Sequence, residues 1–250
     1  MLRGASPVFG AAMRQARLRQ HRSSRRNQIF RRRVAGYAAC FLAAWLSRAE
    51  PLVAFQTPLS EEAVREAYFL GQRHDESVTR ALENYSQYFP VPAYGPQISW
   101  VTYLTPFAQA ILASSNHIGN YSAQQAQIAH RGLRETLEIQ VGVRFTDSYP
   151  ALIPSLRPTP RGSPPQLVPR SYEFWRDFEV TVFDGDQPLE PSSVEGRPDY
   201  RCNQHSCFLI GATILLDFPA EAFAKQDVTV QVDPPEGDRF VTGLDLANLR

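Results

Sequence analysis

The spacing of apolar residues along the chain changes from helical to alternating near residue 136. Within residues 57–132, apolar side chains recur every three to four positions, which is typical of amphipathic helices. Four polar residues stand where their side chains can cap a helix: Ser60, Asp75, Thr105 and Ser122. The pattern predicts four short helices within a helical region over residues 50–135, the second of them continuing through Tyr85 and Phe89.

From Thr136 onward the pattern is that of half-buried strands. Residues 136–145 alternate strictly between apolar and polar or small side chains, and shorter alternations follow at 178–182 and 228–232. The apolar run Cys207–Phe218 predicts a strand buried on both faces, and Phe240–Leu246 predicts a returning strand. We therefore expect an α+β fold, in which N-terminal short helices pack on a C-terminal antiparallel β-sheet or small β-sandwich.

Seven prolines interrupt the β-rich region, which is expected to cover residues 136–250. They fall at positions 150, 154, 158, 160, 164, 165 and 169. Because proline donates no backbone hydrogen bond, neither a ladder nor a helix is expected there, and residues 149–170 are predicted to form an extended loop. One α+β domain is the preferred interpretation, and two loosely joined domains are the alternative.

The N-terminus has the charge order of an export signal. Residues 1–49 hold eleven of the 26 basic residues and none of the 25 acidic ones, so they carry +11 and the remaining chain −10. The uncharged run Val34–Leu46 follows the arginines and is too short to cross a bilayer as a helix, which needs about 20 residues. This order predicts a signal peptide over residues 1–49 that is cleaved after Ala49. A nucleic-acid-binding arm and an uncleaved membrane anchor are the alternatives.

Export agrees with the cysteine count. If Cys40 leaves with the signal peptide, Cys202 and Cys207 remain as a pair, and an oxidising compartment favours a disulfide between them. A metal site that also uses His205 would lack the fourth ligand of a structural zinc centre. The chain has 25 arginines and one lysine, a bias that indicates a GC-rich bacterial genome.

Known catalytic and cofactor motifs are missing from the sequence. It contains no nucleophile elbow, zinc-protease helix, phosphate-binding glycine loop or dinucleotide fingerprint, so we predict no catalytic residue, metal ligand or cofactor. The least ordinary segment carries Tyr88, Tyr94 and Trp100 among prolines. Such rings can form a stacking platform for a glycan or a peptide, or they can close the core.

These observations predict an exported protein of the periplasm or extracellular space. We expect a non-enzymatic binding or envelope-associated protein with a protein or glycan partner, no nucleic-acid partner, and membrane contact only through its N-terminal signal segment. An exported hydrolase with a carboxylate-based site is one alternative, so enzymatic activity stays open. A membrane-anchored protein with an uncleaved N-terminal segment is the other.

Overall fold

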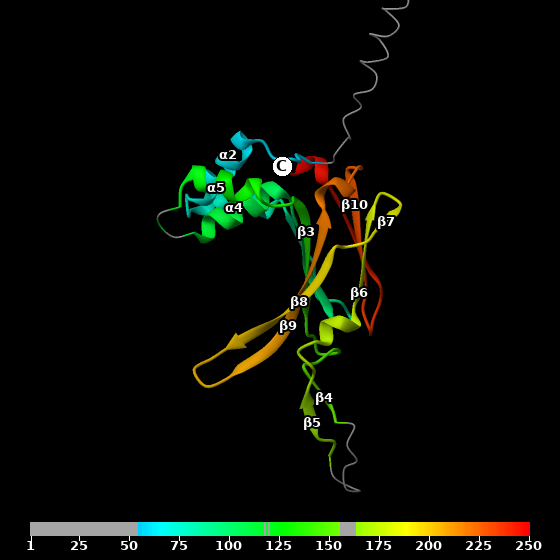
Figure 1. Ribbon diagram of the computed structural model, residues 1–250. Helices are drawn as coiled ribbons and strands as arrows, with labels where there is room; N and C mark the ends of the chain where they lie inside the picture. The colour runs from blue at the N-terminus through cyan, green and yellow to red at the C-terminus, as the bar shows by residue number, and fades with distance from the viewer. Residues whose placement is uncertain (1–54, 118, 120, 156–163) are drawn as a thin grey trace, which may run out of the picture. The chain divides into compact units, whose positions relative to one another are not determined.

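A computed structural model of the chain describes residues 55–117, 119, 121–155 and 164–250. The predicted signal peptide and its cleavage site at Ala49 lie outside these residues. The described residues all belong to one compact unit. Its described part is an α+β fold, as the sequence predicted, with helices beside antiparallel sheets (Figure 1).

All four predicted helices are present, and each predicted cap is formed. They are α2 (Glu61–Gly71), α3 (Glu76–Glu83), α4 (Pro106–Asn116) and α5 (Ala123–Arg131). The Ser60 hydroxyl accepts a hydrogen bond from the backbone of Ala63, and Asp75 and Thr105 cap the next two helices in the same way. Ser122 and Gln125 form the reciprocal capping box that begins α5.

Two strands lie within the segment that was predicted to be helical, so that prediction is wrong between residues 86 and 104. They are β1 (Ser86–Tyr88) and β2 (Gln97–Leu104). The second helix ends at Glu83 instead of reaching Phe89. Tyr85, which fitted the helical stripe, instead accepts a backbone hydrogen bond from Tyr103 (2.8 Å). Pairing with β2 therefore overrides the local helical spacing of residues 85–89.

The larger sheet has the strand order β1-β2-β3-β9-β8, and all its pairings are antiparallel. It is completed by β3 (Thr136–Arg144), β9 (Cys207–Pro219) and β8 (Ser193–Cys202). The sequence predicted β3 and β9 but not β8. The prediction that Cys207–Phe218 is buried on both faces holds near its end and fails at its start, because Phe208 is exposed.

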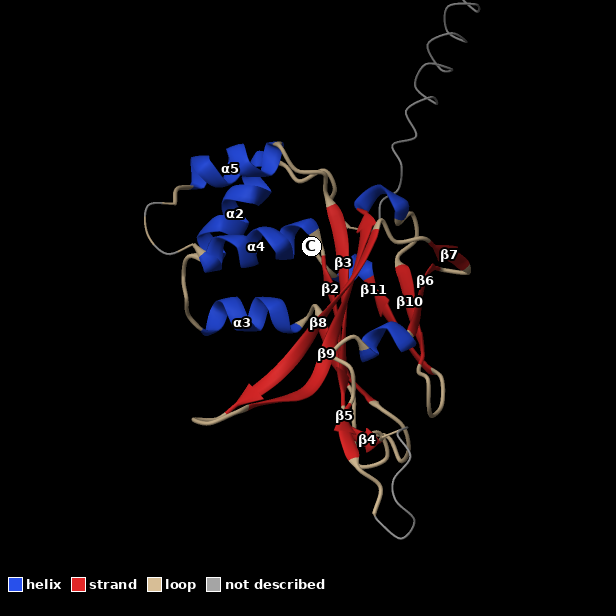
Figure 2. Ribbon diagram, turned by 60° about the horizontal axis from the view of Figure 1, so that its bottom comes forward, coloured by secondary structure: helices blue, strands red, loops and turns tan. Residues whose placement is uncertain are grey.

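The smaller sheet has the order β11-β10-β6-β7. Its strands are β6 (Glu179–Asp184), β7 (Gln187–Leu189), β10 (Asp227–Asp233) and β11 (Phe240–Asp245). The smaller sheet lies on one side of the larger sheet, and the helices α2 to α5 lie on the other side (Figure 2). Fully buried side chains of both sheets, among them Ile139 and Val230, share the main core. A second core of α2, α4 and α5 residues surrounds Ala67 and Ile111.

The proline-rich segment contains a short ladder, which contradicts the prediction that its prolines would exclude one. Strand β4 (Leu152–Pro154) pairs with β5 (Leu167–Pro169). Backbone hydrogen bonds join Ser155 to Gln166 and Arg170 to Ala151 at the two ends of the ladder. In an antiparallel ladder every second aligned pair is hydrogen-bonded, so the pairs next to these two are not. Pro154 and Pro169 occupy the non-hydrogen-bonded pairs, where an N–H is not needed.

Candidate functional site

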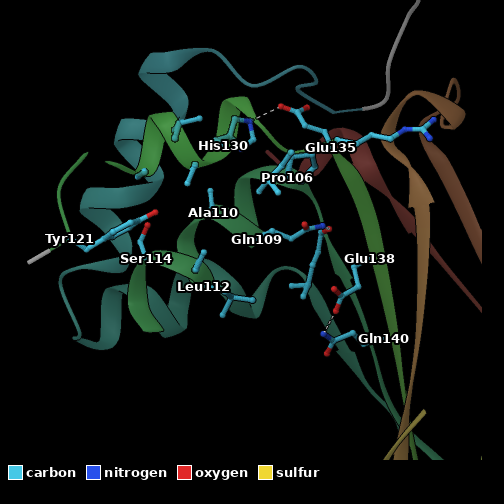
Figure 3. Close-up of a pocket in the computed structure, with 17 residues that line it drawn as sticks. Pro106, Gln109, Ala110, Leu112, Ser114, Tyr121, His130, Glu135, Glu138 and Gln140 are labelled. Carbon is cyan, nitrogen blue, oxygen red and sulfur yellow. Dashed lines mark hydrogen bonds and ion pairs between the residues drawn. The ribbon is translucent and has the colours of Figure 1, made fainter. Parts of the chain in front are cut away.

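A cavity of about 380 Å³ opens between the helices and the outer face of the larger sheet, which we call the helix–sheet cavity (Figure 3). Its apolar wall comes from α2, α4, α5 and the segments beside them: Val64, Leu104, Pro106, Ala110, Leu112, Ala126 and Leu133. Its volume lies within the range of small-molecule sites, about 300–1,000 Å³. The sequence did not single out this site.

The start of α4 fixes one side of the cavity. Thr105 caps the helix, and Pro106 occupies its first turn, where proline is favoured. The Gln109 amide nitrogen donates to the backbone oxygens of Leu104 (2.9 Å) and Thr136 (2.8 Å), and so connects α4 to β2 and to the first residue of β3. Because these two bonds hold the side chain in place, the Gln109 amide is a fixed polar group in the cavity wall.

The sheet supplies the polar end of the cavity. Glu138 and Gln140 are alternate residues of β3, so both point to the outer face, and the Gln140 amide donates to the Glu138 carboxylate. Within the described part of the chain, no other donor contacts the Glu138 carboxylate, and none contacts the Gln109 side-chain oxygen. This end of the cavity therefore presents hydrogen-bond acceptors and a negative charge.

A second carboxylate, Glu135, lies at the rim and accepts three hydrogen bonds from the fold. One of its oxygens accepts from the Leu59 backbone N–H (2.7 Å) and from His130 Nε2 (2.8 Å), and the other accepts from the Thr57 hydroxyl (2.5 Å). These bonds connect the segment before α2, the end of α5 and the residue that precedes β3. Glu135 therefore stabilises the packing of the helices.

The structure divides the predicted aromatic platform into two places. Tyr88 and Trp100 are direct cross-strand partners on β1 and β2. The Ser86 and Thr102 hydroxyls, two residues away on each strand, contact each other at 2.6 Å, which places this set on one face. Tyr94 instead lies in the loop before β2 and lines a separate cavity beside Pro234 and Phe240.

The three rings also differ in exposure. Tyr88 and Tyr94 are exposed, whereas Trp100 is half-buried with its indole over Gly142. Two other aromatic residues of the same segment, Tyr85 and Tyr103, are buried in the core. The alternation of the strands explains this division, because odd positions of β2 near its end face inward and even ones face outward.

The cysteines form the predicted disulfide. Cys202 and Cys207 are bonded across the tip of the β8–β9 hairpin, with their Cα atoms 3.9 Å apart. His205 lies in the turn, where its backbone N–H donates to Asn203. The described residues contain no group of three or more His, Cys, Asp or Glu side chains arranged to hold a metal ion. The disulfide is compatible with an oxidising compartment.

Comparison of the chain with protein-family models and with curated proteins found no match. Among the helices in the described residues, none is long and apolar enough to cross a bilayer. A fold alone does not imply a function, so the geometry of the sites themselves carries the evidence for one.

Proposed function

We propose that this chain is an exported, non-enzymatic binding protein whose helix–sheet cavity takes up an apolar group of a partner protein. The observation that carries the proposal is a preformed apolar cavity that ends in the fixed acceptors Gln109 and Glu138. The favoured group is therefore an aliphatic chain that ends in a hydrogen-bond donor or a cation. A lysine-like side chain or a free alkylamine has this chemistry.

The bonding of Glu135 favours binding over hydrolysis. Carboxylate catalysis in a glycosidase needs two carboxyl groups that are free to transfer a proton or attack the substrate. Glu135 accepts three hydrogen bonds that hold the helices to the sheet, whereas Glu138 accepts one, so Glu138 is the less engaged of the two carboxylates that line the cavity. An exported hydrolase is therefore the weaker candidate.

The disulfide supports the exported setting of the proposal. The two cysteines that follow residue 49 are joined to each other. Such a bond fits a protein that works outside the reducing cytosol. N-terminal sequencing of the protein purified from its source tests this setting, since a start at Met1 or Met13 would contradict cleavage after Ala49.

A ligand competition tests the chemistry of the cavity. A fluorescent naphthylamine probe is displaced by alkyl chains of equal length that end in an amine, an alcohol or a carboxylate. We expect the amine to bind about tenfold more tightly than the alcohol, and the carboxylate to bind most weakly, because Glu138 is negatively charged. Glu138→Gln should remove most of the preference for the amine, and Glu62→Gln, an exposed change on α2, should preserve it. Equal affinities for all three chains would refute the proposed ligand class.

A further inference from the structure

We infer that the chain pairs with a second copy of itself through the outer edge of β8, which extends the larger sheet across a two-fold axis at Gly196. Strand β8 is an edge strand, since β9 is its single neighbour in the sheet. An edge strand of this length can pair with another chain by backbone hydrogen bonds. This surface is separate from the helix–sheet cavity and does not depend on the function proposed for it.

The register shows which backbone groups of β8 face outward. Bonds from Phe145 N to Ile210 O (3.3 Å) and from Ala220 N to Glu135 O (3.1 Å) show that even-numbered residues of β9 bond toward β3. The odd-numbered residues of β9 therefore form their backbone hydrogen bonds with β8. Between Ser193 and Asp199, the β8 residues aligned with them are also odd-numbered. The even-numbered residues of β8 therefore direct their backbone groups away from β9, toward the open edge of the sheet. These groups are the N–H and C=O of residues 194 and 196 and the C=O of residue 198.

The position of proline agrees with this assignment. Pro198 has no N–H to donate, and it occupies an outward-facing position where β9 requires none. In a symmetric pair centred on Gly196, each Gly196 N–H donates to the Gly196 carbonyl of the other copy. The Val194 N–H then donates to the Pro198 carbonyl of the other copy, so the proline serves as an acceptor.

Charge favours this register over the two neighbouring ones, in which the axis lies at Glu195 or at Arg197. With the axis at Gly196, Glu195 of each copy lies directly opposite Arg197 of the other, in a non-hydrogen-bonded pair where side chains approach closely. Moving the axis to Glu195 or to Arg197 would instead place identical charges opposite each other. In the described part of the chain, neither side chain has an ion-pair partner, whereas the nearby Asp199 is already paired with Arg144 (2.6 Å).

The inner side of the edge can receive the apolar residues of the second copy. A groove of about 390 Å³ lies between the two sheets beside β8, lined by Val194, Trp175, Phe178 and Ile214. The Trp175 indole lies over Gly196, where an added Cβ would be 2.0 Å from the ring. Val194 and Pro198 point to the same side as Leu216 and Ala212, so those of the second copy would meet this groove.

Charge reversal tests the pairing. We expect the purified protein to have twice the mass of one chain in sedimentation equilibrium at micromolar concentrations. Glu195→Arg and Arg197→Glu should each give a single-chain mass, because each places like charges opposite each other twice. An equimolar mixture of the two variants should regain the double mass, since both contacts across the axis then become attractive. This recovery also shows that neither variant is merely misfolded.

Arg201→Glu is the matched control, because it makes the same charge change on β8 beyond the irregularity after Asp199. We expect it to keep the double mass. A wild-type protein with single-chain mass throughout that concentration range would overturn the inference. So would single variants that keep the double mass, or a mixture of the two that stays at single-chain mass.

Discussion

The two faces of the larger sheet differ in how completely they are covered. The inner face packs on the smaller sheet at its centre, where the β3 residues Leu137, Ile139, Val141 and Val143 have no exposed surface. The outer face carries Glu138 and Gln140, and the helices beside it leave the helix–sheet cavity open. The same strand thus supplies the core with one set of alternate residues and the candidate site with the other.

This difference indicates that the residues important for stability and the residues important for binding lie on different faces of the larger sheet. Substitutions at tightly packed positions should change the free energy of unfolding, and substitutions of the residues that line the cavity should change ligand binding. The largest effect on stability is expected on the inner face, and the smallest at an ion pair on the smaller sheet.

Truncation of Ile139 should cause the largest loss. Ile139→Ala leaves a cavity in a fully buried position between two strands and should lower the free energy of unfolding by about 3 kcal/mol. Gln140→Ala, its neighbour on the outer face, should change it by about 0.5 kcal/mol or less. Urea denaturation followed by circular dichroism measures both. Equal losses would mean that the two faces do not differ as described.

Gly142 tests the packed part of the outer face. A Cβ at this position would lie 2.4 Å from the Trp100 indole, so Gly142→Ala should move the ring and cost about 1–3 kcal/mol. The tryptophan emission spectrum should change at the same time. Gly132→Ala is the control, because its Cβ would meet a single atom at 3.7 Å. An unchanged spectrum in Gly142→Ala would show that Trp100 does not lie over this glycine.

A buried hydroxyl interrupts the apolar inner face. The Tyr103 hydroxyl is buried and has no hydrogen-bond partner among the described residues, and its burial raises the pKa of Tyr103 above the ordinary value of 10.0. Tyr103→Phe removes this unpaired group and should stabilise the protein by about 1 kcal/mol. A destabilised Phe variant in urea denaturation would reveal a hidden partner for the hydroxyl.

The same residue gives a pH dependence. Because folding raises the pKa of Tyr103, the folded state retains a proton that the unfolded state loses above pH 10.0. The free energy of unfolding of the wild type should therefore fall as the pH rises beyond this value, and that of Tyr103→Phe should fall less steeply. Denaturation at a series of alkaline pH values measures the two slopes, and identical slopes would contradict the assignment.

The smallest effect is expected at an exposed ion pair on the smaller sheet. Hydrogen bonds from Arg239 and Gln231 hold the pKa of Asp233 below its ordinary value of 3.8. This carboxylate stabilises the fold above that value, and its contribution is lost as the pH falls through the lowered pKa. Asp233→Asn should therefore be slightly less stable than the wild type at neutral pH and indistinguishable from it in strong acid. Acid denaturation curves that differ equally at both limits would refute this.

Local signals predicted the four helices and the strands β3, β6, β9, β10 and β11, because the causes of these elements are local. Ser60 and Ser122 cap helices through bonds to residues three positions away, and the alternation in β3 lies within the strand itself. The strands β1, β2, β4, β5, β7 and β8 escaped prediction. Strand β2, for example, is held by β3, a partner that is distant in the sequence. In β8, Gly196 and Pro198 weaken the local strand pattern, although both suit an edge.

The helix–sheet cavity could not be predicted for a similar reason. Its wall combines α4 residues such as Ala110 with Glu138 of β3, and the sequence does not show that these segments face each other. The small side chain of Ala110 was consistent with an ordinary buried helix face. Of the predicted site residues, Cys202 and Cys207 are joined, and the platform of Tyr88, Tyr94 and Trp100 stays a prediction, now divided between two surfaces.

Filling the cavity is the most direct test of the proposed binding site. Ala110→Phe places a ring in the space between α4 and the sheet, whereas Ala224→Phe adds the same ring at an exposed position outside the cavity. Titration with the fluorescent naphthylamine probe measures both variants against the wild type. We predict that Ala110→Phe abolishes saturable binding and that Ala224→Phe binds like the wild type. Undiminished binding by a folded Ala110→Phe variant would contradict the assignment of this cavity as the binding site.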